Sequence, residues 1–363
     1  MSRISGHWFL PGPVEVHPAV AAAMGRPPMT HRGEAMHALW TGMQEPLRQV
    51  FRTSRPVLIG AGSGTSFMEA AIRSGVRERV LCVVGGEYGR RFAEIAVACD
   101  KEVIQVMVPH GRALEADHLE QFLDGPEVDA VALVHAETST GALAPLADLA
   151  AVVRAHKDVL LLVDAVSAVG GLPVETDLWG LDFVFSAGQK ALAVPPGLAL
   201  GVASPRLIER ARGMEARGRY LDLARLAEAA ERQEPPTTPA LPQMYALDAQ
   251  LRRIREAGGI ETRWKRHHEM LTTVEEWSLL HPEVELLAQA GRRAWTVSCL
   301  RLPPAHPADR VIQGLAARGF TVGQGMGAMQ ESVIRIGHMG EVTPDQVQGL
   351  LQALAEELAG ERP

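Results

Sequence analysis

The sequence predicts an α/β fold, with a mostly parallel sheet covered by helices on both faces and a smaller α+β unit after it. From about residue 55 onward, short apolar runs rich in leucine and β-branched residues alternate with segments whose apolar residues recur at helical spacing. After about residue 205 this alternation gives way to longer helical segments and then to shorter strands. Strand–helix alternation is typical of parallel sheets whose strands are joined by helices.

The first part of the chain contains the elements of the predicted parallel sheet. Strands are expected at residues 57–59, 79–84, 103–108, 129–135, 159–164, 183–186 and 198–203. Helices are expected between them at residues 66–74, 90–99, 115–122 and 145–156. Because ligands of open α/β sheets bind outside the carboxyl ends of the strands, we expect the functional residues directly after the strand runs.

The second part of the chain has longer predicted helices and shorter predicted strands. Helices are expected at residues 207–214, 221–232, 241–256 and 262–280, and later at 309–318 and 343–358. Short strands are expected at residues 284–288, 296–302, 321–322 and 333–336. The last helix begins at Thr343-Pro344-Asp345, where threonine is a favourable N-cap and proline fits the first helical position. We therefore expect a large domain over residues 15–250 and a small α+β domain over residues 251–363.

The composition argues against several classes of protein. The 363 residues are 47% hydrophobic and carry a formal net charge of -7, so we expect neither a nucleic-acid nor a membrane partner. The longest apolar runs, such as residues 159–163, are too short to cross a bilayer. The first ten residues show no signal peptide, and we expect a cytoplasmic protein. Cys82, Cys99 and Cys299 form neither a disulfide framework nor a metal motif, so no metal site is expected.

A glycine-rich segment, Gly60-Ala61-Gly62-Ser63-Gly64-Thr65, stands between the first strand and its helix. Glycines let backbone N–H groups approach a phosphate, and the helix N-terminus adds partial positive charge. The hydroxyls of Ser63 and Thr65 can donate further hydrogen bonds. The segment lacks the ending of a Walker loop and does not complete a dinucleotide fingerprint. Taken alone, it predicts either a phosphate cradle or a turn that binds nothing.

Two charged residues follow neighbouring strand runs. Asp164 ends the most apolar strand, and its buried carboxylate needs a partner because unpaired burial is costly. That partner is either the N–H groups of residues 165–171 or a protonated ring nitrogen of a cofactor. Lys190 stands beside the apolar residues 191–197, which disfavour its ammonium form and make it a candidate Schiff-base former. The alternative for Lys190 is a side chain that extends to solvent.

Together these segments resemble the fold-type I pyridoxal-phosphate (PLP) enzymes, and among them the class V aminotransferases of the alanine–glyoxylate and serine–pyruvate type. The matching segments stand in the family's order: LPGP at 10–13, GSGT at 62–65, HAETSTG at 135–141, VDAVS at 163–167, SAGQKALAVPPG at 186–197 and IRIG at 334–337. The segment around Lys190 is the most specific. The resemblance implies a seven-stranded large domain, a smaller C-terminal domain, and an N-terminal segment 1–14 near the active site.

The resemblance also implies roles around the ring of the cofactor, pyridoxal 5'-phosphate. Lys190 would form the Schiff base, and Asp164 would pair with the pyridinium nitrogen; these two would be catalytic. Tyr88 would stack on the ring, and Thr138 would place a hydroxyl close to it. From the residues alone, Tyr88 could instead be a helix-start residue with no ligand.

For the phosphate and the substrate, the resemblance implies two further groups of residues. Ser63, Gly64 and Thr65 would hold the phosphate, with Gln189 beside it. Thr238 would reach the phosphate of the neighbouring subunit, which implies a homodimer with shared active sites. Gly12 would leave room for the substrate, and Arg335 would bind its carboxylate in a bidentate manner. Arg335 could otherwise pair with a carboxylate at the sheet edge.

The implied reaction is amino transfer from alanine or serine to glyoxylate or pyruvate. The chain departs from the alanine–glyoxylate type at Tyr88, Pro235 and Thr65, where that type has tryptophan, tyrosine and histidine; these departures affect the substrate assignment. The alternatives are a 2-aminoethylphosphonate or phosphoserine aminotransferase, marked by extra basic residues, and a lyase with a mobile catalytic cysteine. A non-catalytic binding module of the same fold is a further alternative.

Three weaker candidates have more ordinary interpretations. His31 and Arg32 precede a predicted helix, where a capping or solvent-facing role competes with entry into a partner's active site. His135 ends a strand near the expected cofactor, but a core histidine explains it equally well.

Overall fold

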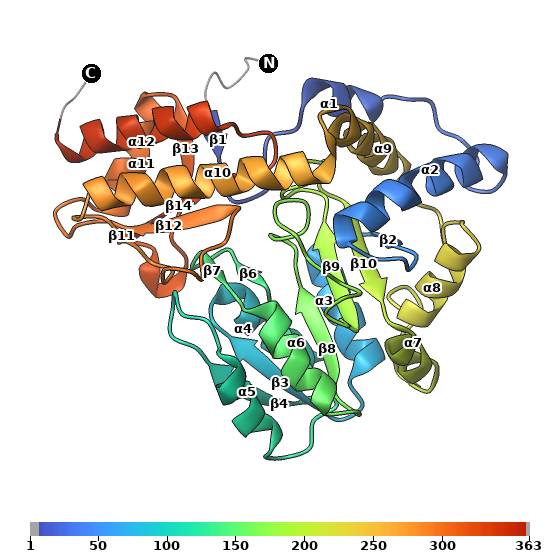
Figure 1. Cartoon of the computed structure of the whole chain (residues 1–363). Helices are drawn as coiled ribbons and strands as arrows, with labels where there is room; N and C mark the ends of the chain where they lie inside the picture. The colour runs from blue at the N-terminus through green and yellow to red at the C-terminus, as the bar shows by residue number, and fades with distance from the viewer. Residues whose placement is uncertain (1–6, 361–363) are drawn as a thin grey trace.

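A seven-stranded sheet forms the centre of the computed structural model, which describes residues 7–360 (Figure 1). Its strand order is β2-β10-β9-β8-β5-β3-β4. The strands are Leu58–Ala61 (β2), Arg79–Val84 (β3), Glu102–Met107 (β4), Ala130–Val134 (β5), Leu160–Asp164 (β8), Phe183–Ala187 (β9) and Leu198–Ala203 (β10). β10 is antiparallel to both of its neighbours, and the other neighbouring strands are parallel. The predicted mostly parallel sheet is confirmed.

Helices cover this sheet because each presents an apolar stripe to it. Helix α3, for example, buries Phe67, Met68, Ala71 and Ile72. In Figure 1, α6 lies in front of the sheet, whereas α3 and α4 lie behind it. The helices up to this point of the chain are Pro18–Ala23 (α1), Glu34–Phe51 (α2), Gly64–Gly75 (α3), Glu87–Ala98 (α4), Ala116–Leu123 (α5) and Leu146–Ala155 (α6). The next three helices are Pro205–Arg212 (α7), Leu223–Glu231 (α8) and Leu241–Glu256 (α9). A small hairpin consists of Ala136–Glu137 (β6) and Ala142–Leu143 (β7).

A second, five-stranded sheet has the order β1-β13-β14-β12-β11 and its own apolar core. Its strands are His7–Phe9 (β1), Glu285–Leu286 (β11), Val297–Arg301 (β12), Phe320–Gln324 (β13) and Val333–Gly337 (β14), with helices Ala308–Ala317 (α11) and Pro344–Leu358 (α12) against it. The start of the chain therefore adds an edge strand to the C-terminal sheet. Residues 1–6 and 361–363 lie outside the described residues, including part of the N-terminal segment expected near the active site. The predicted Thr343 cap of α12 is confirmed as a capping box with Gln346.

Helix α10, Gly259–Leu280, belongs to both halves of the molecule and runs from α9 along the second sheet (Figure 1). Ile260 and Trp264 pack into the core of the large sheet, and Met270 and Val274 pack into the core of the second sheet. The division of the chain at residues 250/251 thus stays a proposal, since no sharp boundary separates the two cores. Between residues 7 and 360, no helix is both long and apolar enough to cross a membrane.

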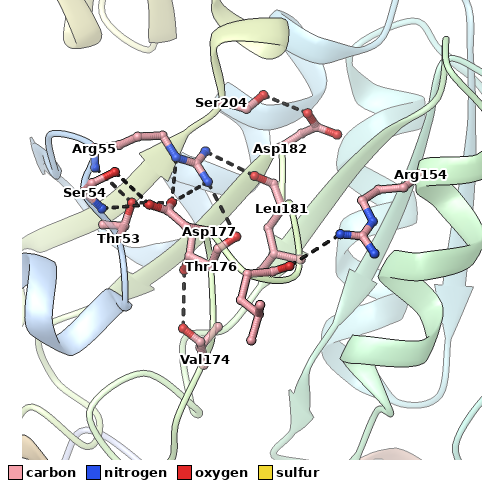
Figure 2. Close-up of polar contacts among 11 residues, drawn as sticks. Thr53, Ser54, Arg55, Arg154, Val174, Thr176, Asp177, Leu181, Asp182 and Ser204 are labelled. Atoms are coloured by element: carbon pink, nitrogen blue, oxygen red, sulfur yellow. Dashed lines mark hydrogen bonds and ion pairs between the residues drawn. The ribbon is translucent and has the colours of Figure 1, made fainter.

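A carboxylate joins the loop before β2 to the loop before β9 (Figure 2). Asp177 accepts hydrogen bonds from the Thr53 hydroxyl at 2.7 Å, from the Ser54 N–H at 2.8 Å and hydroxyl at 2.9 Å, and from Arg55 Nε at 2.9 Å. Partial burial opposes ionisation of Asp177, but these hydrogen bonds outweigh it and lower its pKa from 3.8 to about 2. The loops are therefore held together by an ionised group.

We expect Asp177→Ala to destabilise the fold by roughly 1 kcal/mol at pH 7, after allowance for solvent screening of an exposed group. Because the pKa of Asp177 is lowered in the folded state, its contribution is complete above the ordinary value of 3.8 and is lost as pH falls toward about 2. Denaturant unfolding of both proteins across this pH range measures the difference. Asp158→Asn, at an exposed carboxylate, is the control. A difference that stayed constant down to pH 2 would contradict the electrostatic explanation.

Candidate active site

Two buried, oppositely charged side chains lie at the carboxyl ends of neighbouring strands. Asp164 is the last residue of β8, and Lys190 follows β9, its parallel neighbour. Asp164 is 3% exposed and Lys190 is 6% exposed. Each is close enough to alter the other's pKa, since the carboxylate favours the ammonium form and the ammonium favours the carboxylate. The prediction that these side chains meet at one edge of the sheet agrees with this geometry.

The pKa of the Lys190 amine lies closer to neutral pH than that of an ordinary lysine. Burial lowers its pKa to about 8, and the Asp164 charge opposes that shift. The Nζ atom donates a hydrogen bond to the Pro11 carbonyl and lies 5.8 Å from the centre of the Tyr88 ring. A substantial fraction of the amine is therefore uncharged at neutral to mildly alkaline pH, which a nucleophile or a base requires.

One of the two oxygens of the Asp164 carboxyl accepts a hydrogen bond. Burial raises its pKa to about 7, whereas the hydrogen bond from the Val166 N–H to Oδ1, at 2.8 Å, lowers it. Among residues 7–360, the second oxygen, Oδ2, accepts no hydrogen bond. A positively charged N–H placed against Oδ2 would satisfy this oxygen and favour the ionised form.

The glycine-rich segment leads into the same region. Ser63 is the N-cap of α3 but makes no capping hydrogen bond through its side chain, and both Ser63 and Thr65 are exposed. Gly64 lies so close to Val166 that a Cβ atom at this position would be 2.6 Å from the valine side chain. The start of α3 therefore presents hydroxyls that would suit an anion, beside the Asp164 strand end.

Glu137 is a buried carboxylate beside the pair, and no pattern in the sequence singled it out. This buried carboxylate accepts hydrogen bonds from the N–H groups of Tyr88, at 3.2 Å, and Gly89, at 3.1 Å, and thereby caps helix α4 from another part of the chain. Gly86 permits this contact, because a Cβ atom there would collide with Glu137 and Ser139. The Tyr88 ring is held over the Lys190 amine as a result. The signal that could have located it is the position of this glutamate shortly after a buried strand.

Gly12 and Arg335 approach the pair from the second sheet. Gly12 has a φ of +117°, and a Cβ atom on it would be 2.6 Å from Lys190 Nζ, so a side chain here would displace the amine. Arg335, on β14, donates from Nε to the Gln324 carbonyl at 2.7 Å and from Nη1 to the Thr138 carbonyl at 3.5 Å. The Thr138 hydroxyl itself pairs with Ser167 Oγ at 3.0 Å.

Among the described residues, none of the remaining candidates bonds to the Lys190 amine. Gln189 presents a buried Oε1 that has no hydrogen-bond partner in the described chain. Thr238 is exposed and lines a hollow with Ser66 and Tyr220 of its own chain. His135 is buried against Trp179, and burial lowers its pKa to about 4, as expected for a core histidine. Within residues 7–360, no side-chain hydrogen bond or ion pair joins His31 or Arg32 to the pair, and no cluster of three or more histidine, cysteine or acidic residues could hold a metal.

These residues fit the chemistry of PLP. A buried amine can take its aldehyde, the open oxygen of Asp164 can take its ring N–H, Tyr88 can cover its ring, and the end of α3 can bind its phosphate. A seven-stranded, mostly parallel sheet with a smaller C-terminal sheet domain and this donor set define a PLP-dependent enzyme of fold type I.

Comparison with known proteins narrows the class. The family model "Aminotransferase class-V" matches residues 78–350. The chain is 35% identical over 339 residues to an uncharacterized aminotransferase of Methanocaldococcus jannaschii, covering 92% of this chain and 87% of that protein. It is 28% identical over 351 residues to the L-aspartate–glyoxylate aminotransferase of Paracoccus denitrificans, covering 92% and 86%. The crystal structure of an alanine–glyoxylate aminotransferase from Nostoc sp. superposes with a TM-score of 0.92 at 31% identity, covering 99% and 96%. The chain belongs to the class V aminotransferase family, whose members use PLP.

Proposed function

We propose that the protein transfers the amino group of a small amino acid, alanine or serine, to a small 2-oxo acid, glyoxylate or pyruvate. The observation that carries this proposal is the confinement of the Lys190 amine between the Pro11 carbonyl, Gly12 and the Tyr88 ring. A side chain at position 12 would collide with the amine, so the glycine leaves room beside it for a substrate with a short side chain. The names of the relatives from Paracoccus and Nostoc, which share glyoxylate, support the acceptor.

In this mechanism PLP, when bound, supplies an aldehyde for the amino group and a ring that withdraws electrons. Lys190 would hold the coenzyme through its aldehyde and, once free as an amine, would take the proton from the substrate Cα and deliver it to the coenzyme carbon. A pKa of about 8 suits both roles of Lys190. Asp164 would keep a proton on the ring nitrogen, and Arg335 would bind the substrate carboxylate. Tyr88 would cover the ring, and the end of α3 would hold the phosphate.

The position of Arg91 favours a second candidate donor for amino transfer, one that carries a second anionic group. Its guanidinium lies 4.8 Å from the centre of the Tyr88 ring, and its charge lowers the pKa of both Lys190 and Asp164. Among the described residues Arg91 makes no ion pair with a carboxylate. A free cation beside the site would suit a donor with a second anionic group, such as aspartate or 2-aminoethylphosphonate.

The cysteines do not favour a lyase that depends on a catalytic thiol. Burial raises the pKa of Cys82 and of Cys299 to about 12, and Cys99 stands at the end of α4 with its pKa also raised by burial. Thiolates are the reactive form, so none of these residues is prepared for nucleophilic attack.

A matrix of amino donors and keto acceptors tests the proposal. Alanine, serine, aspartate, phosphoserine and 2-aminoethylphosphonate are each mixed with the yellow holo-protein, and the loss of the visible band is timed before glyoxylate or pyruvate is added. We expect alanine or serine to react fastest. Faster reaction of aspartate or 2-aminoethylphosphonate would favour the role of Arg91 instead. Protein that stayed colourless with added PLP would support a binding module and overturn the proposal.

We also propose a homodimer in which Thr238 donates a hydrogen bond to the phosphate in the neighbouring subunit. Its exposure in the single chain supports this role. Thr238→Ala is expected to weaken PLP binding by about tenfold, the usual worth of one hydrogen bond to a charged group. Equilibrium dialysis measures the affinity, and sedimentation measures the assembly. A monomer with full activity would contradict the proposal.

A further inference from the structure

The backbone that carries Lys190 is held at three successive carbonyls. The Gln189 carbonyl accepts the Val14 N–H at 3.1 Å, and the Lys190 carbonyl accepts the Ala193 N–H at 2.8 Å. The Ala191 carbonyl accepts two hydrogen bonds from one side chain, Arg263 on α10, from Nε at 3.1 Å and from Nη2 at 2.7 Å. Among residues 7–360, Arg263 is thus the one side chain that donates a hydrogen bond to any of these three carbonyls.

Arg263 is itself buried, with 7% of its surface exposed. A buried guanidinium needs a counter-charge, because desolvation of an unpaired charge is costly. Glu341 supplies it: its Oε1 accepts a hydrogen bond from Arg263 Nη1 at 3.1 Å and another from Gln250 Nε2 at 2.8 Å. Arg253 reaches the other oxygen of Glu341 at 3.3 Å but does not touch Ala191.

The loop that carries Glu341 also packs against the lysine segment, residues 186–197. A Cβ atom on Gly340 would lie 3.3 Å from Ala193 Cβ and 3.0 Å from Val14. The Gly340 N–H is bonded to His267 Nε2 of α10 at 3.1 Å. This loop follows β14, the strand of Arg335. Arg263 therefore joins the lysine segment to the part of the molecule that presents Arg335.

We propose that Arg263 is a positioning residue for amino transfer: its two hydrogen bonds to the Ala191 carbonyl, anchored by Glu341, fix the backbone of Lys190 and so place Nζ relative to Asp164. This inference rests on the proposed role of Lys190. A buried ion pair that only stabilises the fold is the competing explanation, and the experiments must separate the two.

The first test follows how apo-protein captures PLP, by absorbance and by mass after borohydride reduction. Arg263→Gln keeps N–H donors but loses the planar fork and the charge. We expect capture to slow by about 10- to 100-fold, because displacement of a reacting group by about 1 Å has effects of this size. Arg263→Lys, with one donor toward Ala191, should restore part of the rate. Arg253→Ala, which removes a contact to Glu341 alone, should behave as wild type.

The second test measures the single-turnover rate at a series of donor concentrations. Each rate is normalised to the amount of bound PLP. We expect the maximal rate of Arg263→Gln to fall by about 10- to 100-fold while half-saturation by the donor changes by less than about threefold, since the donor's own contacts remain. Glu341→Gln keeps the side-chain shape and should show a smaller fall of the same kind. If Arg263→Gln does not fold, Glu341→Gln and Arg263→Lys serve as the test variants in its place.

The results separate the possible failures. Arg263 variants that lost thermal stability but captured PLP and turned over at wild-type rates per loaded site would overturn this inference alone. Wild-type protein that captured no PLP would overturn the proposed function as well.

Discussion

Lys190→Ala is expected to reduce the single-turnover rate by at least about 10²–10⁴-fold, the usual contribution of a positioned acid–base group, and to remove covalent capture of PLP altogether. The physical reason is that no other described amine lies near Asp164. Borohydride treatment of the wild-type holo-protein followed by peptide mapping should place the coenzyme on the peptide that contains Lys190. Capture by the wild-type apo-protein should rise with pH through about 8, because the neutral amine reacts and burial lowers the pKa of Lys190 to that value.

The chain offers a clean control for this experiment. Its other lysines are Lys101, Lys157 and Lys265, and Lys157 and Lys265 are exposed. Lys157→Ala and Lys265→Ala should leave capture and turnover unchanged. Coenzyme found on another lysine, or unchanged turnover in Lys190→Ala, would refute the assignment of this residue.

Asp164→Asn is expected to slow turnover by roughly 10²–10³-fold, the scale of a lost electrostatic contact in a preorganised site. An amide cannot hold a proton on the ring nitrogen as a carboxylate does, whereas Lys190 is untouched. The variant should therefore still capture PLP and turn yellow, which separates its defect from that of Lys190→Ala. Stopped-flow absorbance with alanine as donor measures the rate.

The pH dependence of PLP binding gives a second measurement on Asp164. Burial raises its pKa to about 7 in the chain without cofactor, so the carboxyl gains a proton as pH falls through this value. A protonated ring nitrogen prefers the ionised carboxylate, and the affinity for PLP should therefore fall below about pH 7. In Asp164→Asn the contribution of the carboxyl to this decline should be absent, and only the dependence on the Lys190 amine should remain. Equal turnover of the variant and the wild type would contradict the role of Asp164.

Local patterns located most of the large sheet and the central pair of the site. The strand at residues 198–203 and the helix at 241–256 coincide with β10 and α9, because continuous apolar runs and helical spacing are read from neighbouring residues. Asp164 and Lys190 could be singled out for a similar reason, since Asp164 ends a buried strand and Lys190 stands shortly after the next one. The predicted strand at 284–288 was too long: β11 has two residues, because only Glu285 and Leu286 pair with β12.

Features that depend on contacts between distant residues could not be predicted. Helix α4 begins at Glu87, earlier than the predicted residue 90, because Glu137 caps it from another strand. Arg263 stands 72 residues from the carbonyl that it holds, and no local pattern distinguishes it from its neighbours on α10. The strand at His7–Phe9 was also missed, since three residues have no periodicity and their partner lies at Phe320–Gln324.

The pairing of β1 with β13 has a consequence for biosynthesis. His7 lies opposite Phe320, so β1 has no partner until β13 has been synthesised. The central sheet can form earlier, from segments that are close in sequence. Strand β1, which leads into Pro11 and Gly12, is therefore paired only after the segment that carries Lys190 has been made.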